Sequence, residues 1–157
     1  RDILNAVDYD SLYSNTTYNN FHGDLQFDNI IFNEDKDTFT YIDWRESFAG
    51  NTDEGDIYYD LSKLYGGLLM PYNLMKKEDL LQYEEGESLI NFSYEEEKSL
   101  LDFKSYYEKW LDKKGFDLKK IKLITALIYL NMSPLHEEKF GKILWFKSIE
   151  MFSYANK

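Results

Sequence analysis

The 157-residue chain contains no cysteine, which excludes disulfide bonds, thiolate nucleophiles and cysteine metal ligands. It also lacks any hydrophobic run of the roughly 20 residues needed to span a bilayer. The most apolar stretch, residues 121–132, is shorter and carries Lys122, so it predicts a buried helix and no membrane insertion. No secretory signal is visible, and a cytoplasmic location is the default expectation.

Positive charge is scarce, since 18 lysines and arginines against 29 aspartates and glutamates give a formal net charge of -11. Such a chain repels the phosphate backbone of nucleic acids. No basic stripe with interleaved aromatic side chains offsets that repulsion, so nucleic-acid binding is not expected. A cationic or metal-bound partner suits the chain better.

A hydrophobic content of 43% is enough for one sizeable core at this length, and we expect a single domain over residues 1–157. Residues 30–32 and 38–42 are β-branched and aromatic, with the turn-rich sequence NEDKD between them. This pattern predicts a β-hairpin. The acidic stretch at residues 83–88 is expected to be a solvated loop.

Beyond the hairpin, the apolar residues recur with the period of a helix. Asp56 is placed to cap a first helix, and the spacing of Ser93 and Glu96 predicts a capping box that starts a second, which ends at Gly115. Asp117 starts a third helix, and Ser133 and Pro134 separate it from a fourth. The apolar stripe of the first helix consists of Ile57, Leu61, Leu64, Tyr65 and Leu68. The predicted fold class is mainly α with a small β-hairpin.

The stretch FHGDLQFDNIIF, at residues 21–32, sets His22, Asp24 and Asn29 in the order H-G-D-x-x-x-x-N. Phosphoryl-transfer enzymes use a related H-R-D-x-x-x-x-N loop, in which the Asp takes the proton of the nucleophile and the Asn binds magnesium. Oxygen ligands suit a hard divalent cation. Asp43, at the end of the second hairpin strand, fits a further ligand of the same metal.

HGDLQFDNIIF, the short hairpin, IDW and GDIYYDLSKL follow one another in an order that resembles the aminoglycoside phosphotransferase and choline kinase-like family. The resemblance covers about residues 20–70, whereas residues 90–157 match only as a helical pattern. It implies the C-terminal lobe of a protein kinase-like fold. The catalytic loop and metal-binding hairpin would occupy residues 20–45, and a helical remainder residues 55–157.

The resemblance implies that Asp24 is the catalytic base and that Asn29 and Asp43 bind Mg2+, which accompanies ATP as the phosphoryl donor. His22 is expected to support the loop rather than to carry a proton. The same family pattern makes Asp60 a support of the catalytic loop. On physical grounds Asp60 also needs partners, because it lies at the edge of an apolar stripe; a solvated stripe margin is the alternative.

Three further groups of side chains have both a structural and a functional interpretation. Asp56 is explained by N-capping, with a substrate contact as the less favoured use. The acidic residues Glu46, Asp53 and Glu54 belong to a solvated loop or attract a cationic acceptor. Seven aromatic residues are interpreted mainly as core, with a pocket for a sugar or a quaternary amine as the alternative: Tyr58, Tyr59, Tyr65, Tyr106, Tyr107, Trp110 and Trp145.

None of the eight glycines belongs to a G-x-G-x-x-G phosphate loop. The resemblance implies a small ATP-binding N-terminal lobe of the same protein upstream of these residues, as the missing partner of this lobe. The lobe alone is therefore expected to be inactive and to self-associate through apolar surface that the upstream lobe would cover.

The expected function is ATP-dependent phosphorylation of a hydroxyl group on a small molecule. The stretches IDWRESF and GDIYYDLSKLYGG most resemble family members associated with bacterial surface-polysaccharide synthesis, which favours a sugar as the acceptor. Aminoglycosides or choline-type amines are the alternative acceptors. A non-catalytic kinase-like binding module stays open as a second function class. A metal-dependent hydrolase is a third, without a histidine cluster to support it.

Overall fold

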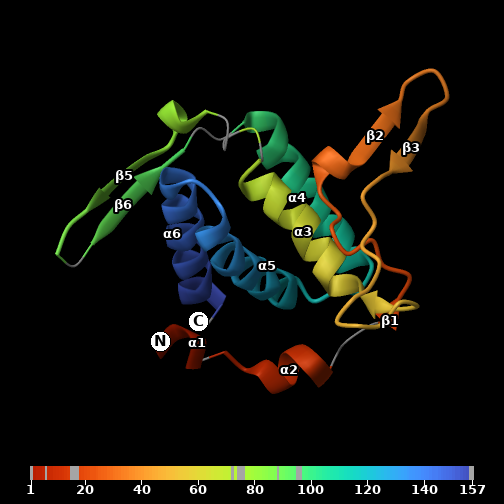
Figure 1. Ribbon diagram of the computed structural model, residues 1–157, viewed down its shortest axis with the longest axis horizontal. Helices are drawn as coiled ribbons and strands as arrows, with labels where there is room; N and C mark the ends of the chain where they lie inside the picture. Colours follow the sequence, from red (N-terminus) through yellow and green to blue (C-terminus); the bar gives the residue numbers. More distant parts are fainter. Residues whose placement is uncertain are drawn as a thin grey trace.

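The computed structural model describes residues 2–5, 7–14, 18–71, 73, 77–87, 89–94 and 97–155, and it is mainly helical (Figure 1). Its helices are α1 (Asp2–Asn5), α2 (Tyr9–Ser14), α3 (Ile57–Leu69), α4 (Lys98–Lys113), α5 (Leu118–Met132) and α6 (Glu138–Ala155). Its strands form three antiparallel pairs: β1 (Tyr18–Asn19) with β4 (Gly55–Asp56), β2 (Ile30–Asn33) with β3 (Thr38–Tyr41), and β5 (Gln82–Glu85) with β6 (Ile90–Ser93).

Two of the predicted helix starts are confirmed together with their caps. The carboxylate of Asp56 accepts a hydrogen bond of 3.0 Å from the backbone N–H of Tyr58, the second residue of α3. Asp117 accepts bonds of 2.8 and 3.2 Å from the N–H groups of Lys119 and Lys120 in α5. These acceptors satisfy amide groups that have no partner within the first turn of a helix.

Helix α3 lies between α4 and α5, and α5 packs in turn against α6 (Figure 1). Hydroxyl groups add hydrogen bonds across the contact between α3 and α5. Thr125 Oγ1 donates to the carbonyl of Ser62 at 3.1 Å, and the Tyr129 hydroxyl donates to the carbonyl of Gly66 at 2.7 Å. The apolar stripe predicted for α3 faces a core cluster shared with α4 and α5, whose buried members are Tyr58, Leu61, Tyr65, Leu68, Tyr107, Leu111 and Ile121.

The hairpin predicted from residues 30–32 and 38–42 is confirmed as the pair β2–β3. Ile30 pairs with Tyr41 and Asn33 with Thr38, and the Asn33 side chain accepts a hydrogen bond of 3.0 Å from Lys36 N–H in the turn. The hairpin extends away from the helices in Figure 1. Its apolar side chains are therefore largely exposed to solvent, as are those that follow it: Ile31, Phe32, Phe39, Tyr41, Ile42 and Trp44.

The solvated loop expected at residues 83–88 is wrong for residues 83–85, which belong to strand β5. The strand forms because Tyr83 and its pair Phe92 both pack against Phe146 of α6, with ring centroids 5.5 and 5.9 Å apart. The exposed polar residues around Tyr83, namely Gln82, Glu84 and Glu85, concealed this contact, because they give the strand the composition of a loop.

The capping box predicted from Ser93 and Glu96 is also wrong. Ser93 is the last residue of β6, and Glu96 lies outside the described residues. Helix α4 begins later, at Lys98, with Glu97 at the N-cap position and no side-chain bond to the first turn. Ser93 pairs with Gln82 of β5, so its backbone belongs to a strand and not to the start of a helix.

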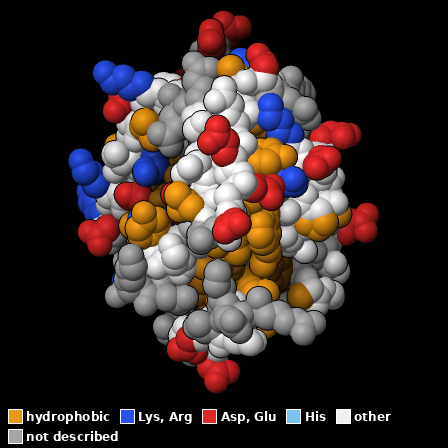
Figure 2. All heavy atoms as spheres, turned by 90° about the vertical axis from the view of Figure 1, so that its left-hand side faces the viewer, with side chains coloured by type: hydrophobic (Ala, Val, Ile, Leu, Met, Phe, Trp, Pro, Cys, Tyr) orange, Lys and Arg blue, Asp and Glu red, His pale blue; other side chains and the backbone are white. Residues whose placement is uncertain are grey.

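The end of the molecule that carries β5, β6 and α6 presents an apolar surface (Figure 2). Hydrophobic side chains gather in the middle of this face, with acidic side chains around them. Leu89, Ile90 and Trp145 are 66%, 39% and 42% exposed there, and they line a groove of about 520 Å³. Among the helices that the structure describes, none is both long and apolar enough to cross a membrane.

Replacing Leu111 with Ala is expected to lower the free energy of unfolding by about 2–5 kcal/mol, because the side chain is 0% exposed within the cluster between α3 and α4. Urea unfolding followed by circular dichroism measures the loss. Leu135, which is 73% exposed, is the matched control, and its replacement by Ala should change the free energy by less than about 0.5 kcal/mol. Equal effects at the two positions would contradict the packing described here.

Candidate active site

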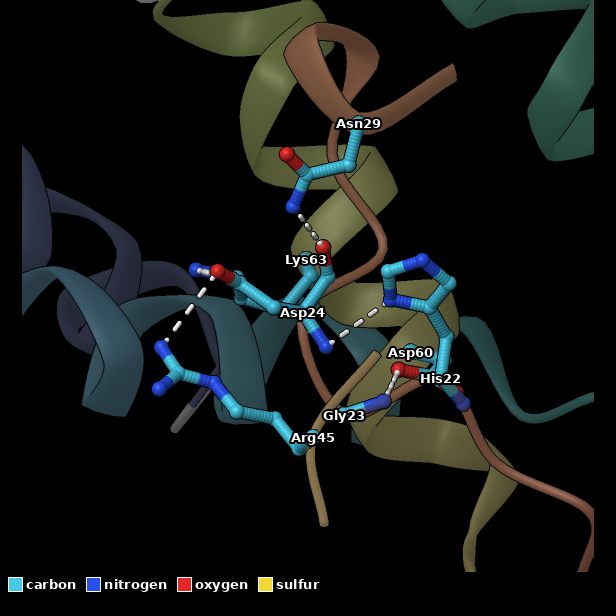
Figure 3. Close-up of polar contacts among 7 residues, drawn as sticks. All are labelled: His22, Gly23, Asp24, Asn29, Arg45, Asp60 and Lys63. Atoms are coloured by element: carbon cyan, nitrogen blue, oxygen red, sulfur yellow. Dashed lines mark hydrogen bonds and ion pairs between the residues drawn. The ribbon is translucent and has the colours of Figure 1, made fainter. Parts of the chain in front are cut away.

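The loop that carries His22, Gly23 and Asp24 is held by one buried carboxylate of α3 (Figure 3). Asp60 Oδ2 accepts a hydrogen bond of 2.6 Å from the backbone N–H of His22, and Asp60 Oδ1 accepts one of 2.9 Å from that of Gly23. Asp60 is only 6% exposed. The hydrogen bonds expected of Asp60 are confirmed, and the alternative of a solvated stripe margin is wrong.

The turn at Gly23 requires a glycine for two reasons. Its φ of +79° lies in the left-handed region, and a Cβ atom at this position would stand 2.6 Å from Cβ of Arg45. The backbone N–H of Arg45 donates to the carbonyl of His22 at 2.9 Å. The segment after β3 therefore lies directly on the loop.

His22 is buried, with 4% exposure, and its ring supports the loop locally. Its Nδ1 accepts a hydrogen bond of 3.3 Å from the backbone N–H of Asp24, and its ring centroid lies 4.7 Å from that of Trp44. Because Nδ1 accepts, the neutral ring carries its proton on Nε2, which is buried and has no partner among the described residues. These contacts agree with the supporting role predicted from the sequence.

The carboxylate of Asp24 is paired with two cationic side chains. Lys63 Nζ lies 2.7 Å from Oδ1, and Arg45 Nη2 lies 3.4 Å from Oδ2. The Asp24 and Lys63 side chains are 15% and 12% exposed, whereas Arg45 is 64% exposed. The pair with Lys63 is therefore the shorter and the less screened by water, and the Arg45 contact is a weaker surface ion pair.

Asp43 follows β3 and has a φ of +58°, an uncommon conformation for a residue other than glycine. It lines a cavity of about 210 Å³ with Asp24, Trp44 and Arg45. The backbone N–H of Ile42 donates to the carbonyl of Asn29 at 3.0 Å, which holds the end of the hairpin to the loop. Asp24 and Asp43 thus line one cavity, so the structure brings together the two carboxylates that the sequence assigned to one site.

Asn29 is 5% exposed, and its Nδ2 donates to the carbonyl of Asp24 at 2.9 Å. Its amide oxygen and the carboxylate of Asp43 are hard oxygen donors of the kind that Mg2+ prefers, so their chemistry fits the metal, but Asn29 is not among the residues that line the cavity of Asp24 and Asp43. Within the described residues, no three His, Cys, Asp or Glu side chains are grouped to hold a metal ion. A magnesium site with two protein ligands would be completed by water and phosphate oxygens.

Lys63 and Arg45 were not predicted as site residues. A signal existed for Lys63, because it follows Asp60 by three positions and so shares the helix face that contacts the loop. For Arg45 no such signal was present. Tyr59 also lies close to the site, since the pKa of its hydroxyl is raised by burial and then by the negative charge of Asp24.

The other candidates divide between core and surface. Asp56 caps α3, as predicted, and Glu46, Asp53 and Glu54 are exposed in the loop that follows Asp43. Tyr58, Tyr65 and Tyr107 are buried in the core, while Tyr106 and Trp145 are 64% and 42% exposed. Tyr59 and Trp110 are partly buried, and Trp110 packs against the core cluster of α3 and α4.

No family model matches the chain, and the comparisons with curated proteins and with solved structures found no match either. The functional argument therefore depends on the residues of this chain and their arrangement.

Replacing Asp60 with Ala is expected to lower the free energy of unfolding by about 1–3 kcal/mol, because the N–H groups of His22 and Gly23 lose their acceptor. Asp60→Asn keeps one acceptor oxygen and should lose less. Thermal and urea unfolding measure both variants. The control is Asp112→Ala in α4, since Asp112 is exposed. An unchanged melting temperature for Asp60→Ala would show that Asp60 does not stabilise the loop.

Lys63→Met is expected to raise the pKa of His136. That pKa is lowered first by burial and then by the positive charge of Lys63, so removing the charge removes the second cause. The ring protons of His136, followed by NMR as the pH is varied, measure the change. Lys122→Met is the matched control, because Lys122 pairs with Glu108. A pKa of His136 that stays the same in Lys63→Met would show that the lysine charge does not reach it.

Proposed function

We propose that this chain is the catalytic lobe of a kinase-like phosphotransferase that transfers the γ-phosphoryl group of ATP to a hydroxyl of a small molecule. The observation that carries the proposal is the cavity shared by Asp24 and Asp43, next to a loop fixed by Asp60. A base and a metal ligand must face the same reacting group in this chemistry. The sequence resemblance over residues 20–70 adds to this support.

In the proposed reaction, a carboxylate oxygen of Asp24 accepts the proton of the acceptor hydroxyl. The hydroxyl oxygen forms a bond to the γ-phosphorus, the bond from that phosphorus to the β–γ bridging oxygen breaks, and ADP leaves with the electron pair. Asn29 and Asp43 would hold Mg2+, which neutralises charge on the transferring group. The hydrogen bonds of Asn29 and His22 to the backbone of Asp24 keep the base in place.

The proposal requires a nucleotide-binding segment, and residues 1–157 contain no glycine-rich phosphate loop. We propose that an upstream lobe supplies it and covers the exposed apolar side chains of β2 and β3, among them Phe32 and Phe39 at 48% and 59% exposure. Without that cover, the same side chains favour self-association. A cytoplasmic location is part of the proposal, because ATP is available there.

A non-catalytic binding module is the second candidate, and one observation favours it. Both oxygens of Asp24 are paired with cations, so two cationic side chains lie where an acceptor hydroxyl would have to approach the base. For catalysis, one of these cations has to turn toward the phosphate or the acceptor when the substrates bind. Arg45, which is the more exposed of the two, is the side chain able to move with the least rearrangement.

The proposal predicts ATP-dependent phosphorylation of sugars, hydroxy acids or amino-alcohols by the chain joined to the segment encoded upstream. Asp24→Asn should lower turnover by about 10²–10⁴-fold, and Asp43→Ala should abolish it by removing a magnesium ligand. Asp53→Ala, an exposed acid of the next loop, is the matched control and should keep full turnover. The assay follows ADP release and the phosphorylated product.

Near-normal turnover in Asp43→Ala would exclude the metal assignment, and no turnover in any arm would favour the binding module. The 157-residue chain alone should bind no ATP productively and give no product. Robust phosphorylation by the chain alone, lost in Asp24→Asn, would show that it needs no upstream lobe.

A further inference from the structure

The backbone of Asp24 is held on both sides, but its side chain is not held by the same contacts. The N–H of Asp24 donates to Nδ1 of His22 at 3.3 Å, and its carbonyl accepts a hydrogen bond of 2.9 Å from Nδ2 of Asn29. Rotation about the two side-chain bonds of Asp24 decides where each carboxylate oxygen points. The orientation of the carboxylate therefore depends on the groups that contact its oxygens.

The two cations on Asp24 hold different oxygens (Figure 3). Arg45 contacts Oδ2 and lines the 210 Å³ cavity together with Asp24, Asp43 and Trp44. Lys63 contacts Oδ1, and it is not among the residues that line this cavity. Oδ2 is therefore the oxygen on the side of the cavity, whereas Oδ1 is held from helix α3.

Lys63 is the cation that sets the orientation of the carboxylate. Its Nζ lies 2.7 Å from Oδ1 and its side chain is 12% exposed, whereas Arg45 Nη2 lies 3.4 Å from Oδ2 and is 64% exposed. Water screens the Arg45 contact more strongly. Lys63 also follows Asp60 by about one helical turn, so the helix face that anchors the loop backbone supplies this contact as well.

The proposed reaction needs Asp24 and Asp43 in different roles, although both line one cavity. Asp43 would bind the divalent cation, and Asp24 has to face the acceptor hydroxyl. Carboxylates are preferred ligands of such cations, and two that line one cavity can bind the same ion. A positive charge on Asp24 opposes that outcome, because it repels a second cation from this carboxylate.

We propose that Lys63 is a positioning residue for the base. It holds Oδ1, so that Oδ2 is the oxygen that accepts the proton, and it keeps the Asp24 carboxylate from joining Asp43 as a cation ligand. This inference rests on the proposed function, because it assigns Asp24 the role of the base.

Binding of Mn2+ to the 157-residue chain without nucleotide tests the inference, with electron paramagnetic resonance to measure the affinity. Lys63→Met should bind Mn2+ at least about tenfold more tightly than the native chain, because a nearby positive charge is removed and an oxygen of Asp24 is released. A purely structural ion pair predicts no such gain. Lys63→Gln, which keeps an uncharged hydrogen-bond donor, should show the gain as well, and Lys63→Arg should not.

Two further variants show whether the gain comes from Asp24. Adding Asp24→Asn to Lys63→Met should return the Mn2+ affinity to about the native value. Lys122→Met removes the same charge from the pair with Glu108 and should change the affinity less than about twofold. No gain in either Lys63→Met or Lys63→Gln, an equal gain in Lys122→Met, or a gain that persists with Asp24→Asn would overturn the inference.

Turnover by the chain joined to its upstream segment provides the second measurement. Lys63→Met should lower kcat by about 10–100-fold, through misplacement of the base, and leave the KM for ATP within about twofold. Lys63→Arg should recover most of kcat. In an Asp24→Asn enzyme, Lys63→Met should lower kcat little further, because the two residues act together.

The two measurements separate this inference from the proposed function. A gain in Mn2+ affinity without phosphorylation in any arm keeps the effect of Lys63 on cation binding and rejects the kinase. Phosphorylation with a native kcat in Lys63→Met keeps the kinase and rejects the positioning role of Lys63.

Discussion

The arrangement of the candidate site depends on one carboxylate, that of Asp60, which accepts the backbone N–H groups of His22 and Gly23. These bonds join residues 37 and 38 positions apart in the chain. They align the loop with α3, which also carries Lys63 into contact with Asp24. A further backbone bond, from the N–H of Arg45 to the carbonyl of His22, joins the loop to the segment after β3. The packing of α3 therefore positions both the loop and the Lys63 side chain that contacts it.

The parts of the fold that depend on local sequence were predictable. An aspartate before an apolar stripe caps a helix wherever that helix packs, and Asp56 and Asp117 behave in this way. Strand β5 was missed because its formation depends on contacts of Tyr83 and Phe92 with Phe146, far away in the chain. The acidic neighbours of Tyr83 have the composition of a loop, and no local signal corrects that impression.

The candidate site also combines residues that could be predicted from the sequence with residues that could not. Asp60 could be predicted from its place beside an apolar stripe, where a carboxylate needs partners, and its partners are those expected. Lys63 could also have been predicted, because it follows Asp60 by about one helical turn and so shares the face of α3 that contacts the loop. The approach of Arg45 to Asp24 could not, because it depends on the positive φ of Asp43 and on the backbone bond from Arg45 to His22. Single-sequence patterns do not report such backbone turns.

Helix α3 carries no side chains at Gly66 and Gly67, where it separates the loop after Asp24 from α5. A Cβ atom on Gly67 would stand 2.9 Å from the Phe27 ring of the loop, and one on Gly66 would stand 3.3 Å from the Tyr129 ring of α5. Two adjacent glycines lower the intrinsic stability of a helix by about 1 kcal/mol each relative to alanine. Because these two positions carry no side chain, Phe27 of the loop and Tyr129 of α5 can approach the backbone of α3 closely. Phe27 and Tyr129 also line a cavity of about 190 Å³ between the loop and helices α3, α5 and α6, so the missing side chains at Gly66 and Gly67 set the width of that cavity.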